Sequence, residues 1–73
     1  MSRYVGYDGC ECLRETEAAL LVRFYDGAEQ WIPKSQIDEG RSEILGYEDS
    51  GRVVLTRWIA DAKDLGDPDV EYV

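Results

Sequence analysis

The stretch Gln30-Trp31-Ile32-Pro33-Lys34-Ser35-Gln36-Ile37 decides the fold, together with the apolar run before it, Ala18-Ala19-Leu20-Leu21-Val22-Arg23-Phe24-Tyr25. Asp26-Gly27-Ala28-Glu29 joins the two runs. Apolar runs on either side of an Asp-Gly turn are typical of a β-hairpin. We therefore expect the rest of the chain to pack around this hairpin.

Alternation along the first run separates its two faces. Leu20, Val22 and Phe24 fall on one face, which we expect to be core, because Arg23 marks the other face as wet. A helical alternative exists over 15–21, where Glu, Ala and Leu are good helix formers. The β-branched and aromatic residues that follow, and the turn directly after them, favour the strand.

The second run is expected to form the return strand over 29–32. Pro33 cannot donate a ladder hydrogen bond, so the strand ends there or lies at a sheet edge. A tight turn over 34–36 is expected to tuck Ile37 inward, and 38–42 is expected to be a polar loop.

Further strands are expected on both sides of the hairpin. Residues 1–9 are predicted to be an edge strand or an ordered arm, and 10–15 alternate like a half-buried strand. Strands are predicted over 43–47 and 52–56, with a hairpin turn of polar residues between them. The acidic tail, 67–73, is predicted to be extended and to pair late with the sheet.

One short helix is predicted over 57–65. Thr56 is suited to cap its N-terminus and Gly66 its C-terminus. Trp58, Ala62 and Leu65 are spaced i, i+4, i+7, so they are predicted to form its buried face.

Together these elements predict an α+β fold: a small antiparallel sheet of about five strands, curled or SH3-like, with one short C-terminal helix. The 73 residues are expected to form a single domain, 1–73.

Charge is the unusual feature of the composition. Sixteen acidic residues face eight basic ones, there is no histidine, and the formal net charge is −8. Such a field steers a protein toward basic partners and repels phosphate backbones, so we expect no direct nucleic-acid ligand and no membrane. The alternative, a surface that is acidic only for solubility, stays open.

The chain begins with Met1-Ser2-Arg3 and has no apolar leader or membrane-spanning run. A cytoplasmic location, in a host bacterial cell, is expected. Cys10 and Cys12 are then expected to be reduced.

Three strings carry a resemblance: Leu13–Ala18, Trp31–Ile37 and Val53–Ala60. The chain resembles a family of small proteins from phages and other bacterial mobile elements, and Trp-Ile-Pro-Lys-Ser-Gln is the most specific string. Its short acidic form is also similar to phage-encoded anti-CRISPR proteins, particularly small inhibitors of type I systems. The resemblance implies a phage setting and a defence complex as partner.

No set of residues points to catalysis, a metal or a cofactor. Zinc prefers four ligands in separated pairs, and Cys10-x-Cys12 has neither a second pair nor histidine, so both cysteines are predicted to pack. No serine has a histidine partner and no carboxylate pair stands out. We expect a protein that is not an enzyme.

Aromatic residues divide into two predicted roles. Trp31 and Trp58 are expected to pack in or against the core, and Lys34 to be only solvated. The tyrosines are better suited to surface contact, because their rings pack while their hydroxyls stay wet; they are Tyr4, Tyr7, Tyr25, Tyr47 and Tyr72.

Clustered carboxylates are the feature on which the predicted function depends. Carboxylates held at the spacing of DNA phosphates can occupy a groove lined by lysine and arginine. The predicted partner-binding residues are Glu48, Asp49, Asp61, Asp64, Asp67, Asp69, Glu71, Tyr47 and Tyr72. The first functional hypothesis is therefore an acidic inhibitor, a DNA mimic, that binds the basic surface of a bacterial defence complex.

The second hypothesis is an SH3-like adaptor or accessory module. It would bind a peptide or a nucleic-acid strand through its sheet face, with Trp31 in contact. A monomer is favoured over a dimer, although an exposed sheet edge offers a route to dimers.

Overall fold

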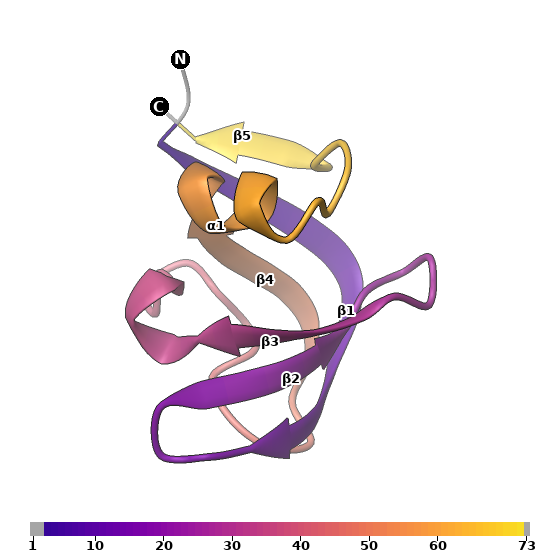
Figure 1. Ribbon diagram of the computed structural model, residues 1–73, viewed down its shortest axis with the longest axis vertical. Helices are drawn as coiled ribbons and strands as arrows, with labels where there is room; N and C mark the ends of the chain where they lie inside the picture. Colours follow the sequence, from indigo (N-terminus) through magenta and orange to yellow (C-terminus); the bar gives the residue numbers. More distant parts are fainter. Residues whose placement is uncertain (1–2, 73) are drawn as a thin grey trace.

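The computed structural model describes residues 3–72, which form an antiparallel sheet and one short helix (Figure 1). The elements are β1 (Tyr4–Glu15), β2 (Ala19–Arg23), β3 (Glu29–Pro33), the 3-10 turn η1 (Lys34–Gln36), β4 (Ser50–Thr56), α1 (Arg57–Ala62) and β5 (Val70–Tyr72). The sheet order is β3-β2-β1-β4, and β5 pairs with β1. The predicted α+β class is confirmed, and the sheet curls without closing into a barrel.

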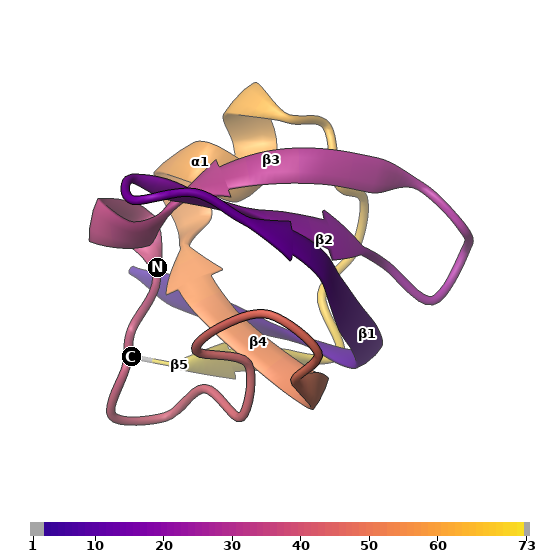
Figure 2. The same cartoon turned by 90° about the horizontal axis from the view of Figure 1, so that it is seen from below.

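β1 is the central strand, so the prediction of an edge strand or arm over 1–9 was wrong for its described part. β1 pairs with β5 over residues 4–6, with β4 over residues 4–11 and with β2 over residues 11–15. In Figure 1, β1 bends as it passes from the upper strands to the lower hairpin. Figure 2 shows the result from below: β2 and β3 form one layer, β4 and β5 another, and β1 belongs to both.

Gly9 makes the bend possible. Its φ is +68°, a left-handed conformation that glycine adopts without strain. The register of β1 against β4 shifts between Tyr7 and Cys10, which indicates a β-bulge at this point. A Cβ on Gly9 would lie 3.0 Å from the Tyr25 ring, so the close approach of the β2–β3 turn also requires glycine.

The β2–β3 hairpin forms as predicted. Leu20, Val22 and Phe24 face the core and are buried, and β3 is an edge strand that ends at Pro33. The turn after it is η1, which brings Ile37 into the core and into a bridge with Leu55 of β4. The hairpin therefore supplies one wall of the core.

The predicted strand over 43–47 does not form. Its first residue bonds to β4 through the backbone, where the Glu43 N–H donates to the Arg52 carbonyl at 2.8 Å. Farther along, the Asp49 carboxylate accepts the N–H groups of Leu45 and Gly46, both at 3.0 Å. The Glu43 carboxylate likewise accepts the Arg52 N–H at 2.8 Å, at the edge of β4. Such local side-chain bonds offer the backbone an alternative to a ladder. The segment still contributes a fully buried Ile44 to the core.

α1 is shorter than predicted and buries a different face. The Thr56 hydroxyl accepts the Ile59 N–H, so the predicted N-cap is confirmed. Ile59 and Ala60 pack into the core, whereas Trp58 and Ala62 are exposed, so the predicted buried face was wrong for these two; Leu65 is partly buried against the core, as predicted. The helix ends at Ala62 because Asp64 takes a left-handed conformation with φ +54°.

A substitution in the irregular segment tests its packing role. Ile44→Ala removes a fully buried side chain and should lower the free energy of unfolding by about 2–4 kcal/mol, as in a regular core. The matched control is Leu45→Ala, at a half-exposed neighbour, which should change it by about 0.5 kcal/mol or less. Urea unfolding measures both. Equal effects at the two positions would contradict the burial of Ile44.

Candidate protein-binding surfaces

The predicted partner-binding residues separate into two groups at opposite ends of the long axis (Figure 1). Tyr47, Glu48 and Asp49 lie in the segment before β4, at the lower end. The second group lies in α1, in β5 and between them, at the upper end: Asp61, Asp64, Asp67, Asp69, Glu71 and Tyr72. The sequence reading treated these residues as one surface, and the fold does not bring them together.

At the upper end, carboxylates from distant parts of the chain surround a small depression. Asp67 and Asp69 line it together with Asp8 of β1 and Asp26 of the β2–β3 turn. Tyr25, 87% exposed, also borders it. The sequence reading missed Asp8 and Asp26 as members of this site, because only the bend of β1 brings them beside the tail.

Tyr7 lies close to several of these carboxylates. Its hydroxyl donates to the Gly66 carbonyl at 2.7 Å, beneath the segment that carries Asp67. Burial raises the pKa of Tyr7; the nearby Arg57 charge lowers it, and the carboxylates of Asp61, Asp67 and Asp69 raise it. The ring is buried against Phe24, so the prediction of surface contact was wrong for Tyr7.

We call Asp26, Asp61, Asp64, Asp67 and Asp69, with Tyr25, the acidic end. None of these carboxylates belongs to an ion pair within residues 3–72. Asp69 does accept the Asp8 N–H at 2.8 Å, which fixes the tail against β1. The negative charge of this end is therefore largely uncompensated by neighbouring cations.

The side chains of Glu71 and Tyr72 are engaged in contacts with arginine side chains of the protein itself, so they are less available to a partner. Glu71 forms an ion pair with Arg57. The Tyr72 hydroxyl accepts from Arg52 at 3.1 Å, and its ring lies 4.8 Å from the Arg41 guanidinium. Arg52 also binds Asp8, and this hydrogen bond lowers the pKa of the Asp8 carboxyl.

At the lower end, Asp49 is committed to its own loop, as its two hydrogen bonds to backbone show. Glu48 is exposed, with φ +74°, and Tyr47 is 59% exposed. Of the predicted residues at this end, the Tyr47 ring and the Glu48 carboxylate remain open to a partner.

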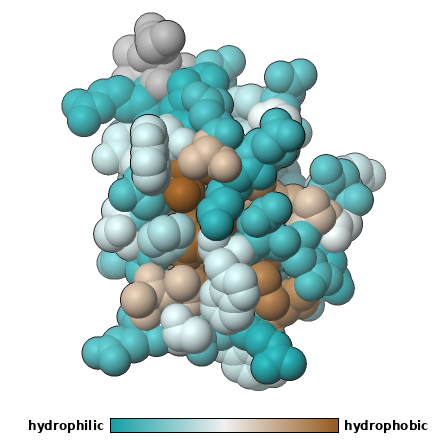
Figure 3. Space-filling view, in the orientation of Figure 1, coloured by the Kyte–Doolittle hydropathy of each residue, from teal (hydrophilic) through white to brown (hydrophobic). Residues whose placement is uncertain are grey.

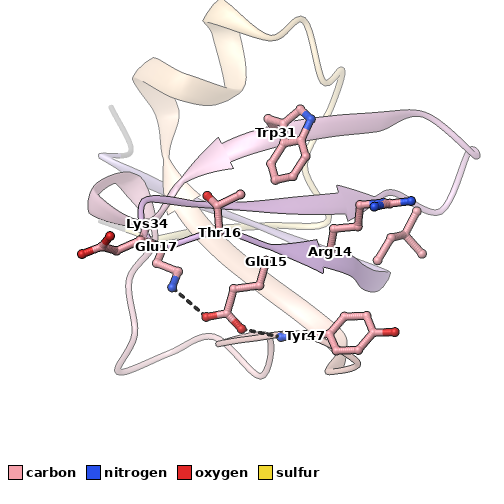
Figure 4. Close-up of a pocket in the computed structure, with 8 residues that line it drawn as sticks. Arg14, Glu15, Thr16, Glu17, Trp31, Lys34 and Tyr47 are labelled. Atoms are coloured by element: carbon pink, nitrogen blue, oxygen red, sulfur yellow. Dashed lines mark hydrogen bonds and ion pairs between the residues drawn. The ribbon is translucent and has the colours of Figure 1, made fainter.

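Tyr47 also borders a groove on the outer face of the hairpin. We call this the aromatic groove; it is lined by Leu13, Arg14, Glu15, Thr16, Glu17, Trp31, Lys34 and Tyr47. Figure 4 shows Trp31 and Tyr47 on opposite sides, with Arg14 and Thr16 between them. Figure 3 shows apolar surface between polar side chains over the lower hairpin, which consists of β2 and β3.

An ion pair forms one wall of the aromatic groove. Glu15 accepts from the Lys34 ammonium at 2.6 Å and from the Tyr47 N–H at 3.0 Å. These bonds, the Lys34 bond first, lower the pKa of the Glu15 carboxyl. Lys34 was predicted to be only solvated, so its pairing with Glu15 corrects that prediction.

Both tryptophans are more exposed than predicted. Trp31 is 41% exposed on the outer face of β3, and Trp58 is 68% exposed on α1. Alternation predicts this for Trp31, because its neighbour Ile32 is fully buried and faces the core. The prediction that Trp31 packs against the core was based on its residue type and not on its alternation with Ile32 along the strand.

The two cysteines pack in the core as predicted, and they are free thiols. Burial raises the pKa of Cys10 to about 12, and the nearby carboxylates of Asp69 and Asp8 add to the rise. Burial also raises the pKa of Cys12. Both thiols are therefore poor nucleophiles in the folded protein.

Within residues 3–72, no three His, Cys, Asp or Glu side chains gather in a way that would hold a metal ion. The one described helix is too short and too polar to cross a membrane. No family model, curated protein or solved structure matches the chain. The resemblance to phage proteins and to anti-CRISPR inhibitors stays a prediction.

Thiol reactivity tests the packing of the cysteines. In mildly alkaline buffer, Cys10 and Cys12 should react with a disulfide reagent roughly a hundredfold more slowly in the folded protein than in urea, because the thiolate forms only on opening. Absorbance of the released thiolate measures the rate. Fast reaction of both thiols in the folded protein would contradict this.

The lowered pKa of Glu15 predicts a pH dependence. The folded chain holds this proton less tightly than the unfolded chain, so the stabilisation is complete above the ordinary carboxyl pKa. It is lost as the pH falls through the lowered value. Glu15→Gln keeps a hydrogen-bond acceptor but removes the charge, so its urea midpoint should fall less steeply with acidification than that of the wild type. Parallel curves for the two proteins would contradict this contribution.

Proposed function

We propose that the protein is an acidic inhibitor that binds the basic, DNA-binding surface of a partner protein through its acidic end. The observation that carries this proposal is the convergence of unpaired carboxylates from the β2–β3 turn and the tail beside the exposed Tyr25. A net charge of −8 gives the whole molecule the same preference.

The spatial arrangement of the ion pairs supports this orientation. Glu11 and Glu15 are neutralised by Arg23 and Lys34 on the lower hairpin. The carboxylates of the acidic end lack such partners within the described chain. Five unpaired carboxylates at the acidic end of the described chain strengthen the negative field there, which accelerates encounter with a positive groove and aligns the two proteins.

Tyr25 supplies an apolar contact with the partner, which the carboxylates do not provide. Its ring is nearly fully exposed beside Asp26, where it has no packing role to lose on binding. Exposed tyrosines are frequent anchors in protein interfaces, because a rigid ring buries much area at low entropic cost. We therefore assign the aromatic contact of this surface to Tyr25 instead of Tyr72.

The resemblance of the chain to phage proteins suggests the partner. We propose a bacterial defence complex that handles DNA, for example a type I CRISPR surveillance complex, in the host cytoplasm. Carboxylates that occupy its lysine- and arginine-lined groove would exclude DNA from the same site.

A second candidate function is an adaptor that binds through its sheet face. The observation that favours it is the exposure of Trp31 on the outer face of β3, within the aromatic groove. This face and the acidic end lie on different parts of the molecule, so one chain has room for both functions.

Charge reversal tests the proposed inhibitor. The tagged wild type should capture DNA-binding proteins from a bacterial lysate at low salt, and duplex DNA or high salt should release them. Asp61→Lys with Asp67→Lys should reduce capture at least about tenfold, because both carboxylates are exposed and unpaired in the described chain. Quantitative mass spectrometry of the eluates measures this.

The matched control is Glu17→Lys with Glu39→Lys, two exposed acids outside the acidic end, which change the net charge equally. This control should retain most of the capture. Equal loss in both double variants would mean that net charge alone acts. Undiminished capture by the Asp61 and Asp67 variant, or capture that duplex DNA does not displace, would overturn the proposed function.

A further inference from the structure

The aromatic groove continues beyond Tyr47 into a second depression. Leu13 and Tyr47 line both, and the second extends to Cys12, Glu11 and Glu48. The combined surface runs from the β1–β2 turn, past Trp31, to the segment before β4. Such an elongated surface fits an extended chain better than a compact small molecule.

The middle of this surface combines exposed apolar rings with one internal ion pair and Arg14, which is unpaired within the described chain. Trp31 and Tyr47 expose their rings, and the half-buried Leu13 lies between the two depressions. The charges of Glu15 and Lys34 satisfy each other. An occupant can therefore cover the middle without leaving either of these two charges unpaired.

The backbone beneath the groove offers little to an added strand. β2 pairs with β1 on one side and with β3 on the other, so its backbone groups are used within the sheet. The outer edge of β3 is open to an added strand, so an occupant that lies across the face itself is one whose own backbone needs no ladder partner. Polyproline II helices meet this condition, since they form no internal hydrogen bonds and dock on exposed aromatic rings.

The charges at the two ends of the surface narrow the class of occupant further. Glu17 at one end and Glu48 at the other have no ion-pair partner within residues 3–72. Arg14 is the unpaired cation between them. Two terminal carboxylates favour an occupant with basic residues at its ends, in agreement with the overall charge of −8.

The geometry points to a proline-rich peptide segment with flanking arginine or lysine residues as the occupant of the aromatic groove. Trp31 and Tyr47 stack on its proline rings, and Glu17 and Glu48 pair with its basic residues. This inference rests on the second candidate function and names its partner class; the acidic end takes no part in it.

The test uses fluorescein-labelled peptides and the full chain. A proline-rich peptide with arginine at both ends should bind at least about tenfold more tightly than a glycine-serine peptide with the same arginines, or than the proline-rich peptide with glutamates instead. Fluorescence polarisation gives the affinities. Two-dimensional NMR should show the indole N–H signal of Trp31 moving while that of Trp58, on α1, stays in place.

Two substitutions locate the binding. Trp31→Ala and Tyr47→Ala should each weaken binding about tenfold, and Trp58→Ala, an equally large exposed ring outside the groove, should change it less than about twofold. Circular dichroism checks folding. Should Trp31→Ala unfold, Tyr47→Ala decides, since its ring is 59% exposed.

Equal binding of the glycine-serine and proline-rich peptides, with the Trp31 signal still moving, would overturn the proline-rich class but keep a sheet-face adaptor. If no peptide moves the Trp31 signal, the inference and the second candidate function both fail. Tighter binding of a labelled single-stranded oligonucleotide than of the peptide would overturn the inference in favour of nucleic acid.

Discussion

The pairing of β1 with β2, β4 and β5 is the constraint on which the other features depend. One strand can serve both layers only if it bends, and Gly9, at φ +68° beside the Tyr25 ring, is where it does so. The bend places the hairpin across the upper strands and encloses a core to which β1, β2, β3, β4, α1 and the irregular Ile44 all contribute. Without that bend, the hairpin and the tail would have no common core.

The same bend determines where the charges and the aromatic rings lie. It brings the β2–β3 turn, with Tyr25 and Asp26, next to Asp67 and Asp69 of the tail, although more than half of the chain separates them. It also leaves the outer face of the hairpin open, so that Trp31 borders a groove instead of a core. The molecule therefore presents two chemically different surfaces at separate places on one small scaffold.

Features with local causes were predictable from the sequence, and those with long-range causes were not. The Asp-Gly turn, the alternation of Leu20, Val22 and Phe24 and the Thr56 cap each depend on a few neighbouring residues, and the structure confirms them. The central position of β1 and the missing strand over 43–47 depend on partners far away in the chain or on competing side-chain bonds. At the candidate site, the tail carboxylates were predictable as a group, whereas their neighbours Asp8, Tyr25 and Asp26 required the fold.

Hydrogen exchange along β1 is the most direct measurement of this shared pairing. If one bent strand unites both layers, the sheet-bonded β1 amides on either side of Gly9 should exchange only through global unfolding. Their opening free energies should then be equal and should match the free energy of unfolding from urea. Fast, independent exchange of the β1 amides before Gly9, with protection retained after it, would show two separately opening layers and contradict the central role of β1.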